Sequence, residues 1–295
     1  MPAELATGEL IQKIRDDHFN VDHIAGYHLM LKLDETKLKF CITEEESHRC
    51  LFIEHIALDK DLSSNGRITL LERIYDDHSF LKAGFWKSVR LIISSRHFTF
   101  IPAPLFDPNE LDSYLSLSTR YQLEQDELGF YAHQNSEAVC AFSINRQLSD
   151  WFRKMYPYKE VQFIHNTSPL IEGALHNTMP DLQKQLFLFA DEDQLTGIVT
   201  FKGKLEFCNV FTFHSPEEFL YYVLWIMREL GMDPNSNNVI LFGEITEESM
   251  LYKKLYEYIR NIGFGDKPSF LKFSYQFDEV NDHRYLDLYC MNLCR

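Results

Sequence analysis

Acidic side chains gather in two turns of the sequence, each of which follows an apolar run. The first turn contains Asp34 and Thr36, and the second contains Asp191 and Asp193. Carboxylates at the end of a buried strand can bind a divalent cation and position the groups that the cation carries. Aspartate is also a common turn residue, because its side chain accepts hydrogen bonds from nearby backbone amides. The residue types therefore allow either a ligand site or two ordinary turns.

A third candidate position is Gly243, which is followed by Glu244 at the end of a continuous apolar run. Together with Asp191 and Glu218, Glu244 could complete a set of carboxylates for metal-dependent nuclease chemistry. Each of these carboxylates also has an ordinary explanation. Asp191 ends a strand in a turn, Glu218 closes a helix capping box, and Glu244 follows its strand rather than lying in it. A metal-dependent nuclease is therefore the least favoured of the alternatives.

Histidine and serine residues form two weaker candidate sites, one for a metal ion and one for nucleophilic catalysis. His18, His23 and His28 recur at a spacing of five, which fits neither a helix face nor one side of a strand, so we expect solvated histidines rather than metal ligands. Ser168 and His165 are close in the sequence, but they lack the strand-turn-helix context of a nucleophile elbow. We expect no catalytic residues among them.

The second half of the chain contains the clearest run of elements. A hydroxyl at Ser215, a proline at the next position and Glu218 predict a helix start, and Gly231 predicts the end of that helix. Apolar alternation and run length predict the other elements. The expected order is strands 185–190, 195–201 and 205–213, the helix 216–230, strand 239–242, a helix 247–263, strand 270–275 and a final helix 284–292.

The first half repeats this order. Asp34 and Leu38 match Asp191 and Leu195 at an offset of 157 (191 − 34), and Val89 matches Val239 at 150 (239 − 89). Ordered matches of this kind indicate an internal duplication. The expected elements are strands 28–33, 38–43 and 50–57, helix 66–82, strand 88–93, an insertion at about 102–143 with a short capped helix and a hairpin, helix 145–155, strand 161–164 and helix 168–176.

These patterns predict a mixed α/β protein made of two tandem units with the order βββαβαβα. We expect an N-terminal extension over 1–24, a first unit over 25–180 that contains the insertion, and a second unit over 181–295. Right-handed crossovers and helices on both faces of each sheet leave few other topologies.

Composition narrows the functional class. The formal net charge of −15 and the pI near 5.2 disfavour nucleic-acid binding, since phosphate backbones are repelled at long range. No run is long and apolar enough for a membrane span or a signal peptide. The six cysteines are scattered, mostly within apolar strands, without metal-binding spacing. We expect a cytoplasmic protein with free thiols and no direct membrane insertion.

Two ribonuclease-H-like units in tandem, the first with an inserted subdomain, resemble the actin-like ATPase superfamily. The stretches 91–106, 141–145 and 163–165 look like the actin-like scaffold proteins of type IV pilus and type II secretion machines. They look closer still to a bacterial family of unknown function with the same fold. The resemblance covers the chain from about residue 25 to its end, and it implies that any nucleotide would lie at the two acidic turns and at the loop after the fourth strand of the second unit.

The chain departs from the ATPase pattern at those positions. In the superfamily, glycines in the turns allow backbone amides to approach the phosphates, but neither Asp34 nor Asp191 is followed by glycine, and Gly243 is followed by Glu244. Extra carboxylates would also repel a polyphosphate. We therefore expect a non-catalytic scaffold or binding protein with a degenerate nucleotide cleft (Asp34, Thr36, Asp191, Asp193, Gly243 and Glu244), no cofactor, and a protein as partner.

The alternative is a weak ATP-binding switch or ATPase that uses Mg-ATP. That alternative predicts that Gly243→Trp abolishes nucleotide binding without unfolding the protein.

Overall fold

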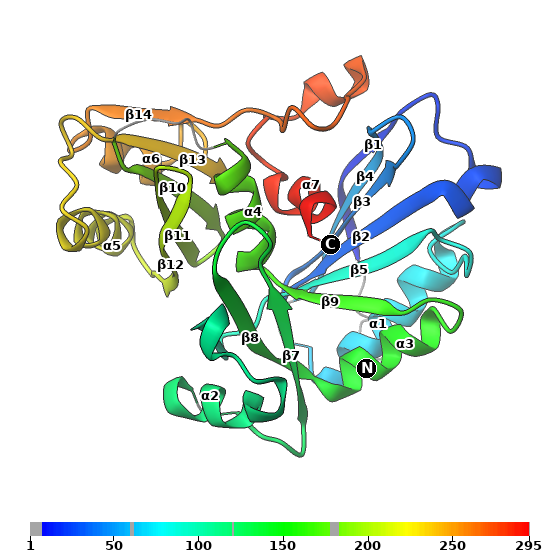
Figure 1. Ribbon diagram of the computed structural model, residues 1–295. Coiled ribbons are helices and arrows are strands. Elements are labelled where there is room, and N and C mark those ends of the chain that lie inside the picture. The colour runs from blue at the N-terminus through cyan, green and yellow to red at the C-terminus, as the bar shows by residue number, and fades with distance from the viewer. Residues whose placement is uncertain (1–7, 60–61, 120, 178–182, 295) are drawn as a thin grey trace, which may run out of the picture. The chain divides into compact units, whose positions relative to one another are not determined.

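Two mixed sheets with the same strand order form the framework of the protein (Figure 1). The computed structural model describes residues 8–59, 62–119, 121–177 and 183–294. Its contacts divide the chain into two compact units. Unit 1 comprises Met1–Ala132, Ala138–Asn166 and Phe270–Phe277, and unit 2 comprises His133–Glu137, Thr167–Ser269 and Asp278–Arg295. The predicted boundary at 180/181 falls on residues outside the described ranges, so the domain limits given by the sequence stay a prediction.

Unit 1 contains a six-stranded sheet with the order β1-β4-β3-β2-β5-β9. In this spatial order, the β1–β4, β4–β3 and β3–β2 pairs are antiparallel. The β2–β5 and β5–β9 pairs are parallel, as expected for strands joined by crossovers. Almost every residue of β2, β3 and β4 is buried, including charged residues such as Lys39 and Glu54, because both faces of this sheet are covered. The strand bounds are β1 Glu9–Arg15, β2 Tyr27–Leu33, β3 Lys37–Glu44, β4 Arg49–Ala57, β5 Ser88–Ile93 and β9 Val161–His165.

Unit 2 contains a five-stranded sheet with the order β12-β11-β10-β13-β14. The β10–β11 and β11–β12 pairs are antiparallel, and the β10–β13 and β13–β14 pairs are parallel. The strand bounds are β10 Gln185–Asp191, β11 Gln194–Phe201, β12 Lys204–Thr212, β13 Asn238–Gly243 and β14 Asn261–Phe264.

The two sheets repeat each other down to single cross-strand pairs. Leu29 pairs with Ile42 in β2–β3, and Leu186 pairs with Val199 in β10–β11, which keeps the offset of 157 for both partners. The pairing of β3 with β4 shifts register between Ile42 and Thr43, and that of β11 with β12 shifts between Val199 and Thr200. Both sheets therefore carry a β-bulge at the same place, which supports the predicted duplication.

Helices cover the sheets and begin where the sequence offers caps. Ser63 and Asn145 accept hydrogen bonds from amides in the first turns of α1 and α3, and Ser215 does the same for α5. The α-helices are α1 Ser64–Asp77, α2 Leu111–Ser118, α3 Arg146–Met155, α4 Thr167–Asn177, α5 Pro216–Glu229, α6 Met250–Tyr256 and α7 Leu286–Cys290. The 3-10 helices are η1 Val21–Gly26, η2 Ala103–Leu105, η3 Pro108–Glu110, η4 Tyr275–Glu279 and η5 Met291–Leu293.

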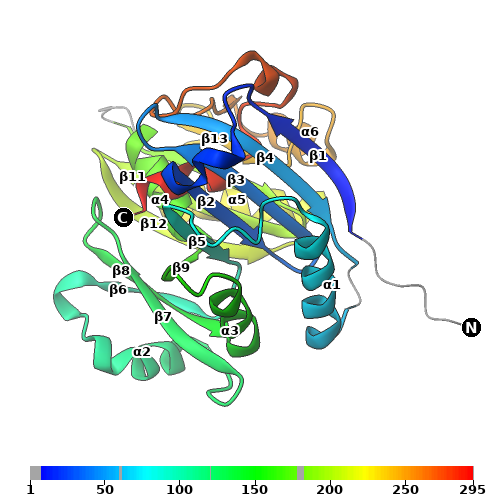
Figure 2. The same ribbon diagram turned by 90° about the vertical axis from the view of Figure 1, so that its right-hand side faces the viewer.

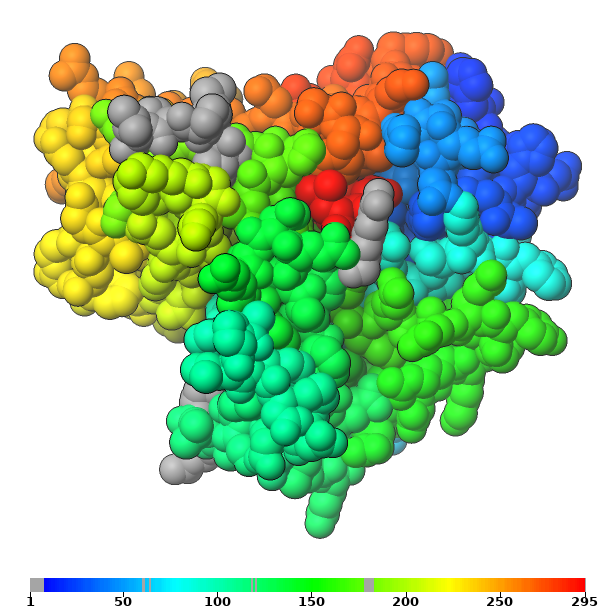
Figure 3. Space-filling model, in the orientation of Figure 1, coloured from blue at the N-terminus to red at the C-terminus, as the bar shows by residue number. Residues whose placement is uncertain are grey.

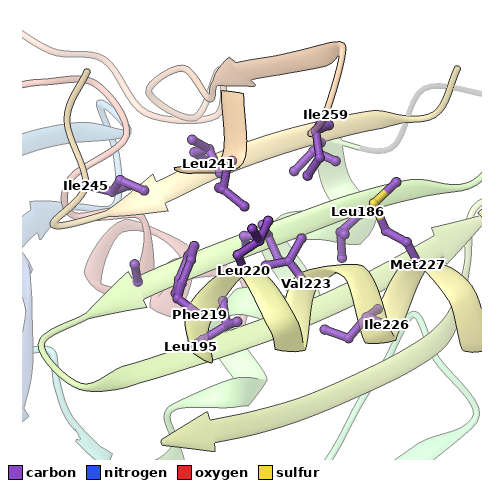
Figure 4. Close-up of a cluster of buried hydrophobic side chains, with 14 of the residues drawn as sticks. Leu186, Leu195, Phe219, Leu220, Val223, Ile226, Met227, Leu241, Ile245 and Ile259 are labelled. Carbon is purple, nitrogen blue, oxygen red and sulfur yellow. The ribbon is translucent and has the colours of Figure 1, made fainter. Parts of the chain in front are cut away.

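Each face of the unit 2 sheet has its own helical layer. Leu186 and Leu188 of β10 belong to the core that α5 and α6 close, together with Phe219 and Val223 of α5 (Figure 4). Side chains from the opposite face of β10, such as Phe187, lie beside α4 and α7. Alternate residues of one strand thus enter different cores, which explains why β10 reads as a continuous apolar run.

The predicted insertion forms a subdomain with a small core. Strands β6 (Phe98–Pro102), β8 (Ala138–Asn145) and β7 (Asp126–Ala132) make a three-stranded antiparallel sheet in that spatial order. Its buried centre consists of Ile101 of β6, Ala141 of β8 and Leu115 of α2, which packs on this sheet. The hairpin and the short helix expected from the sequence are confirmed. Strand β6 begins at residue 98, before the predicted start of the insertion.

Three sequence predictions are wrong. The helix expected over 247–263 ends at Tyr256, and the fifth strand is β14, in which Ile262 pairs with Val239. The strand expected over 270–275 is not part of the unit 2 sheet, because Lys272 instead bridges to Arg49 in unit 1. Finally, part of the predicted N-terminal extension forms β1, which pairs with β4 at the edge of the unit 1 sheet (Figure 2).

His28 also differs from the solvated side chain expected. It lies partly buried on β2, where its Nδ1 is 2.7 Å from Ser88 Oγ. Burial, reinforced by the charges of Arg90 and Lys87, lowers its pKa from 6.5 to about 4. The folded state therefore binds this proton less readily than the unfolded state does, and the stability that depends on neutral His28 is present above pH 6.5 and is lost as the pH falls towards 4.

We predict that His28→Gln makes the protein less sensitive to mild acid. Between pH 7 and pH 5 the wild type should lose about 1–2 kcal/mol more of its free energy of unfolding than the variant does, since glutamine takes up no proton. Urea unfolding of both proteins at the two pH values measures this difference. Equal losses of the free energy of unfolding in both proteins would show that His28 does not cause the sensitivity to acid.

Candidate functional site

The first acidic turn joins β2 to β3 and is held by its own side chains. Asp34 Oδ1 accepts hydrogen bonds from the Thr36 amide at 3.1 Å and from Thr36 Oγ1 at 3.4 Å. The Thr36 carbonyl accepts a hydrogen bond from the Leu58 amide at 2.6 Å. Asp34 and Thr36 therefore lie together as predicted, and their polar groups stabilise the turn.

The second acidic turn joins β10 to β11. Asp191 pairs with Gln194 at the end of the hairpin, which leaves Glu192 and Asp193 as the two loop residues. Glu192 has a φ of +52°, a left-handed conformation for which glycine is the usual residue. The Asp193 carbonyl accepts a hydrogen bond from the Phe213 amide at 2.8 Å. Three carboxylates thus occupy one tight turn.

Gly243 ends β13 and Glu244 follows it, next to the same end of β10, since Ala190 pairs with Gly243 in register. Unit 2 therefore brings Asp191, Gly243 and Glu244 to the same end of its sheet, and their role as a nucleotide site stays a prediction. Gly243 has a φ of +91°, and a Cβ atom there would lie 2.1 Å from the Ala190 carbonyl oxygen. This glycine is required by the close approach of two strands of its own sheet.

The backbone amides at this corner donate to the protein itself. The Gly243 amide donates to the His283 carbonyl at 2.9 Å, and the Glu244 amide donates to the Ala190 carbonyl at 2.7 Å. His283 is fixed in turn, because its Nε2 lies 2.8 Å from the Ile245 carbonyl and its ring stacks on Phe264. Burial lowers the pKa of His283, which favours the neutral ring.

Glu218, the helix carboxylate of the nuclease set, has a structural role at the start of α5. Its Oε2 accepts a hydrogen bond from the His214 amide at 2.7 Å, and its own amide donates to Ser215 Oγ at 3.1 Å. The Ser215 bond is the predicted N-cap, but the Glu218 side chain bonds to the residue before the cap, not to the cap amide as the predicted capping box requires. In the part of the chain that the structure describes, no group of three or more His, Cys, Asp or Glu side chains is arranged to hold a metal ion.

A buried polar network in unit 2 was missed by the sequence analysis. Ser168 Oγ lies 3.3 Å from His133 Nε2, and His133 Nδ1 lies 3.0 Å from Glu172 Oε1. Asn135 Nδ2 donates to the other carboxylate oxygen of Glu172 at 3.0 Å. The contacts are compatible with a chain of hydrogen bonds in which Ser168 donates to His133 Nε2 and His133 Nδ1 donates to Glu172.

The order of groups in this network is that of a serine hydrolase triad. Ser168 and Glu172 are fully buried on α4, however, so no substrate can reach the hydroxyl in this structure. The network instead fastens the loop of His133 to α4. The sequence analysis could not predict these contacts, because His133 lies 35 positions from Ser168 and 39 from Glu172 and no local sequence pattern links them.

His165, the neighbour of Ser168 in the sequence, has different contacts. Its Nε2 lies 2.9 Å from the Ser95 carbonyl, and its ring stacks on Phe98 with centroids 4.3 Å apart. These contacts fix His165 in unit 1, so sequence proximity to Ser168 does not produce a Ser–His pair.

Five of the six cysteines are buried thiols, and Cys208 is partly buried. Most of them lie in strands, as predicted, whereas Cys290 ends α7 and Cys294 follows η5. Among the described helices, none combines the length and the hydrophobicity that crossing a bilayer requires.

Comparisons with known proteins agree with this architecture. A protein of Bacteroides thetaiotaomicron VPI-5482 with an actin-like ATPase fold and unknown function superposes with a TM-score of 0.79 at 19% identity, over 94% of this chain and 99% of that chain. The PilM–PilN type IV pilus biogenesis complex contains a chain that superposes with a TM-score of 0.55 at 12% identity, over 91% of this chain and 98% of that one. A search of curated proteins found no relative. These likenesses establish the fold.

The resemblance inferred from the sequence is thereby confirmed, both for the actin-like fold and for the likeness to a type IV pilus protein. The model of a family described as "Protein of unknown function (DUF3822)" matches residues 16–262. The chain therefore belongs to the DUF3822 family of proteins of unknown function, and it has the fold of the actin-like ATPases.

Proposed function

We propose that this protein is a non-catalytic scaffold or binding protein that retains the actin-like fold without its nucleotide chemistry. The observation that carries the proposal is the use of the strand-end amides. Thr36, Gly243 and Glu244 all donate their backbone N–H groups to acceptors within the protein. An amide already bonded to a protein acceptor has to break that bond before it can hold a phosphate oxygen.

Charge supports the same proposal. Asp191, Glu192 and Asp193 place three carboxylates in one turn of unit 2, and Glu244 follows the adjacent strand. A triphosphate brought to this corner would meet like charges, whose repulsion grows as water is excluded. A protein segment carries no such concentrated charge and can use hydrogen bonds and apolar side chains instead.

The solved relative supports a protein as the partner. The similar chain comes from a structure of the type IV pilus proteins PilM and PilN in complex with each other. We propose by analogy that the present chain also acts by binding another protein. This choice agrees with its acidic surface, which disfavours nucleic acid.

The proposal is tested by thermal unfolding in the presence of nucleotides. We predict that Mg-ATP, Mg-ADP and Mg-GTP at 1 mM leave the unfolding midpoint unchanged. A ligand present at 100 times its dissociation constant would add about 2.7 kcal/mol, which raises the midpoint by roughly 5 °C in a protein of this size. Magnesium alone and each nucleotide with EDTA are the controls. A rise that increases with nucleotide concentration would overturn the proposal in favour of the nucleotide switch.

A further inference from the structure

Strand β12 forms one edge of the unit 2 sheet. It pairs with β11 along one side, and the structure describes no strand along its other side. The corresponding strand of unit 1 is β4, which is covered on that side by β1 in antiparallel register. In Figure 3 the yellow-green residues of β11 and β12 form part of the visible surface of unit 2. The duplication therefore offers an internal comparison between a covered edge and an uncovered one.

Burial differs between equivalent residues of the two strands. Phe52 in β4 pairs with Ile42, and Phe207 in β12 pairs with Val199, which occupies the equivalent place. Phe52 is 1% exposed, whereas Phe207 is only partly buried against the α5 core. No residue of β12 reaches full burial, although seven central residues of β4 do. The uncovered strand is nine residues long, which is long for an exposed edge.

The amide direction along β12 follows from one hydrogen bond at its end. The Phe213 amide donates to the Asp193 carbonyl across the hairpin. Because amides alternate in direction along a strand, the Val210 and Thr212 amides point to the uncovered side. The Val210 amide is 2.9 Å from Asn209 Oδ1, a bond to the side chain of the preceding residue. An added strand would have to displace this exposed side chain before its own carbonyl could accept from the Val210 amide.

The two ends of the uncovered strand β12 differ in charge, which favours one orientation of a partner strand. Lys202 precedes β12 and Lys204 begins it, whereas Asp193 is bonded to the residue after its end. Two other acidic residues nearby are ion-paired within the protein: Glu206 with Lys184 at 2.7 Å and Glu217 with Lys254 at 3.5 Å. An antiparallel partner would begin beside the acidic end and finish beside the basic end. Its favourable charges are therefore basic at its N-terminal end and acidic at its C-terminal end.

We propose that the uncovered edge of β12 is the docking site for an extended segment of a partner protein. The segment adds antiparallel to β12, as β1 does to β4, with alternating β-branched side chains, a basic start and an acidic end. This inference rests on the proposed function as a protein-binding module, and it names the surface that the module uses.

The binding test uses a synthetic probe. A fluorescently labelled nine-residue peptide of alternating valine and threonine, with lysine first and glutamate last, matches the length of β12. We expect saturable binding by fluorescence anisotropy, and we expect binding at least about tenfold weaker when the two terminal charges are exchanged. Absence of binding, or equal binding of both peptides, would overturn the proposed docking site.

Val210→Pro tests the edge on the protein side, because proline removes the outward amide without removing a bond to β11. His55→Pro is the matched control: His55 pairs with Lys39 as Val210 pairs with Thr196, and its outer side is covered by β1. We expect Val210→Pro to keep the wild-type unfolding midpoint within about 2 °C and to weaken peptide binding at least about tenfold, whereas His55→Pro lowers the midpoint.

The outcomes separate this inference from the proposed function. Full peptide binding by Val210→Pro would place the contact elsewhere and overturn the docking site. A dimer in analytical ultracentrifugation that Val210→Pro dissociates would assign the edge to a second copy of this chain and overturn the partner segment. If Val210→Pro unfolds, amide hydrogen exchange of the wild type decides: the Val210 and Thr212 amides must slow at least about tenfold with peptide. The nucleotide titration tests the proposed function independently of all these results.

Discussion

Replacing Gly243 by alanine is expected to lower the free energy of unfolding by more than about 3 kcal/mol. Two effects add at this position. The φ of +91° is unfavourable for any residue with a Cβ atom, and that atom would lie 2.1 Å from the Ala190 carbonyl oxygen. The obstacle is backbone of the neighbouring strand, which cannot move without disturbing the β10–β13 pairing. Urea or thermal unfolding of the variant measures the loss.

Gly231→Ala is the matched control for this prediction. Gly231 also has a positive φ, of +65°, but a Cβ atom there would meet nothing within 4 Å. Alanine at this position should therefore lower the free energy of unfolding by only about 1 kcal/mol, because alanine adopts a positive φ less readily than glycine. If Gly243→Ala were no more harmful than Gly231→Ala, the contact with Ala190 would not constrain the site.

This geometry also corrects the experiment suggested by the sequence. Gly243→Trp was expected to remove a nucleotide-binding loop without unfolding the protein. Because even a Cβ atom overlaps the Ala190 carbonyl, that substitution distorts the end of the sheet, and a loss of binding would not identify a ligand contact. The direct titration with nucleotides on the wild type avoids this ambiguity.

The second large effect is expected at Glu172. Replacement by alanine leaves the buried His133 Nδ1 without its carboxylate acceptor and also removes the bond to the exposed Asn135, and it should lower the free energy of unfolding by about 3 kcal/mol or more. Glu172→Gln keeps the size and one acceptor oxygen, so its loss should be smaller. Ser168→Ala removes a single hydrogen bond and should cost about 1 kcal/mol. Chemical unfolding of the three variants gives the order.

A catalytic role for the same residues would give a different pattern. Fluorophosphonate reagents label an activated serine, and we expect no labelling of Ser168 in the folded protein because its side chain is buried. Labelling that disappears in Ser168→Ala would show that the hydroxyl becomes accessible, and would contradict a purely structural network. If Glu172→Ala were as stable as Ser168→Ala, the carboxylate would not hold the loop.

The sequence predicted the parts of the fold that depend on neighbouring residues. The cap at Ser215, the stop at Gly231 and the strand pairs at the offset of 157 all involve local patterns or their repetition. Strand β14 was misread because Leu255 and Ile259 are buried at a spacing that also fits a helix. The Phe242 ring packs where a Cβ of Gly265 would lie, and this close approach between neighbouring strands cannot be inferred from periodicity.

The candidate site was predicted to the same extent. Its acidic turns and Gly243 were located, because acidic turn residues and glycines are recognisable local signals for turns. The acceptors of the amides were not predictable: His283 lies 40 positions (283 − 243) from Gly243, and its carbonyl has no sequence signature. The network around His133 was missed for the same reason, since contacts between distant residues depend on the completed fold.

The irregular pairing shared by the two sheets bears on the history of the chain. In β4 the residue Leu51 lies between the partners of Ile42 and Thr43, and in β12 Glu206 lies between the partners of Val199 and Thr200. A bulge interrupts the hydrogen-bond ladder, so two independent strands have little reason to acquire one at the same step. Copying of one ancestral half that already carried this extra residue would produce the same bulge in both sheets, with side chains that diverged afterwards.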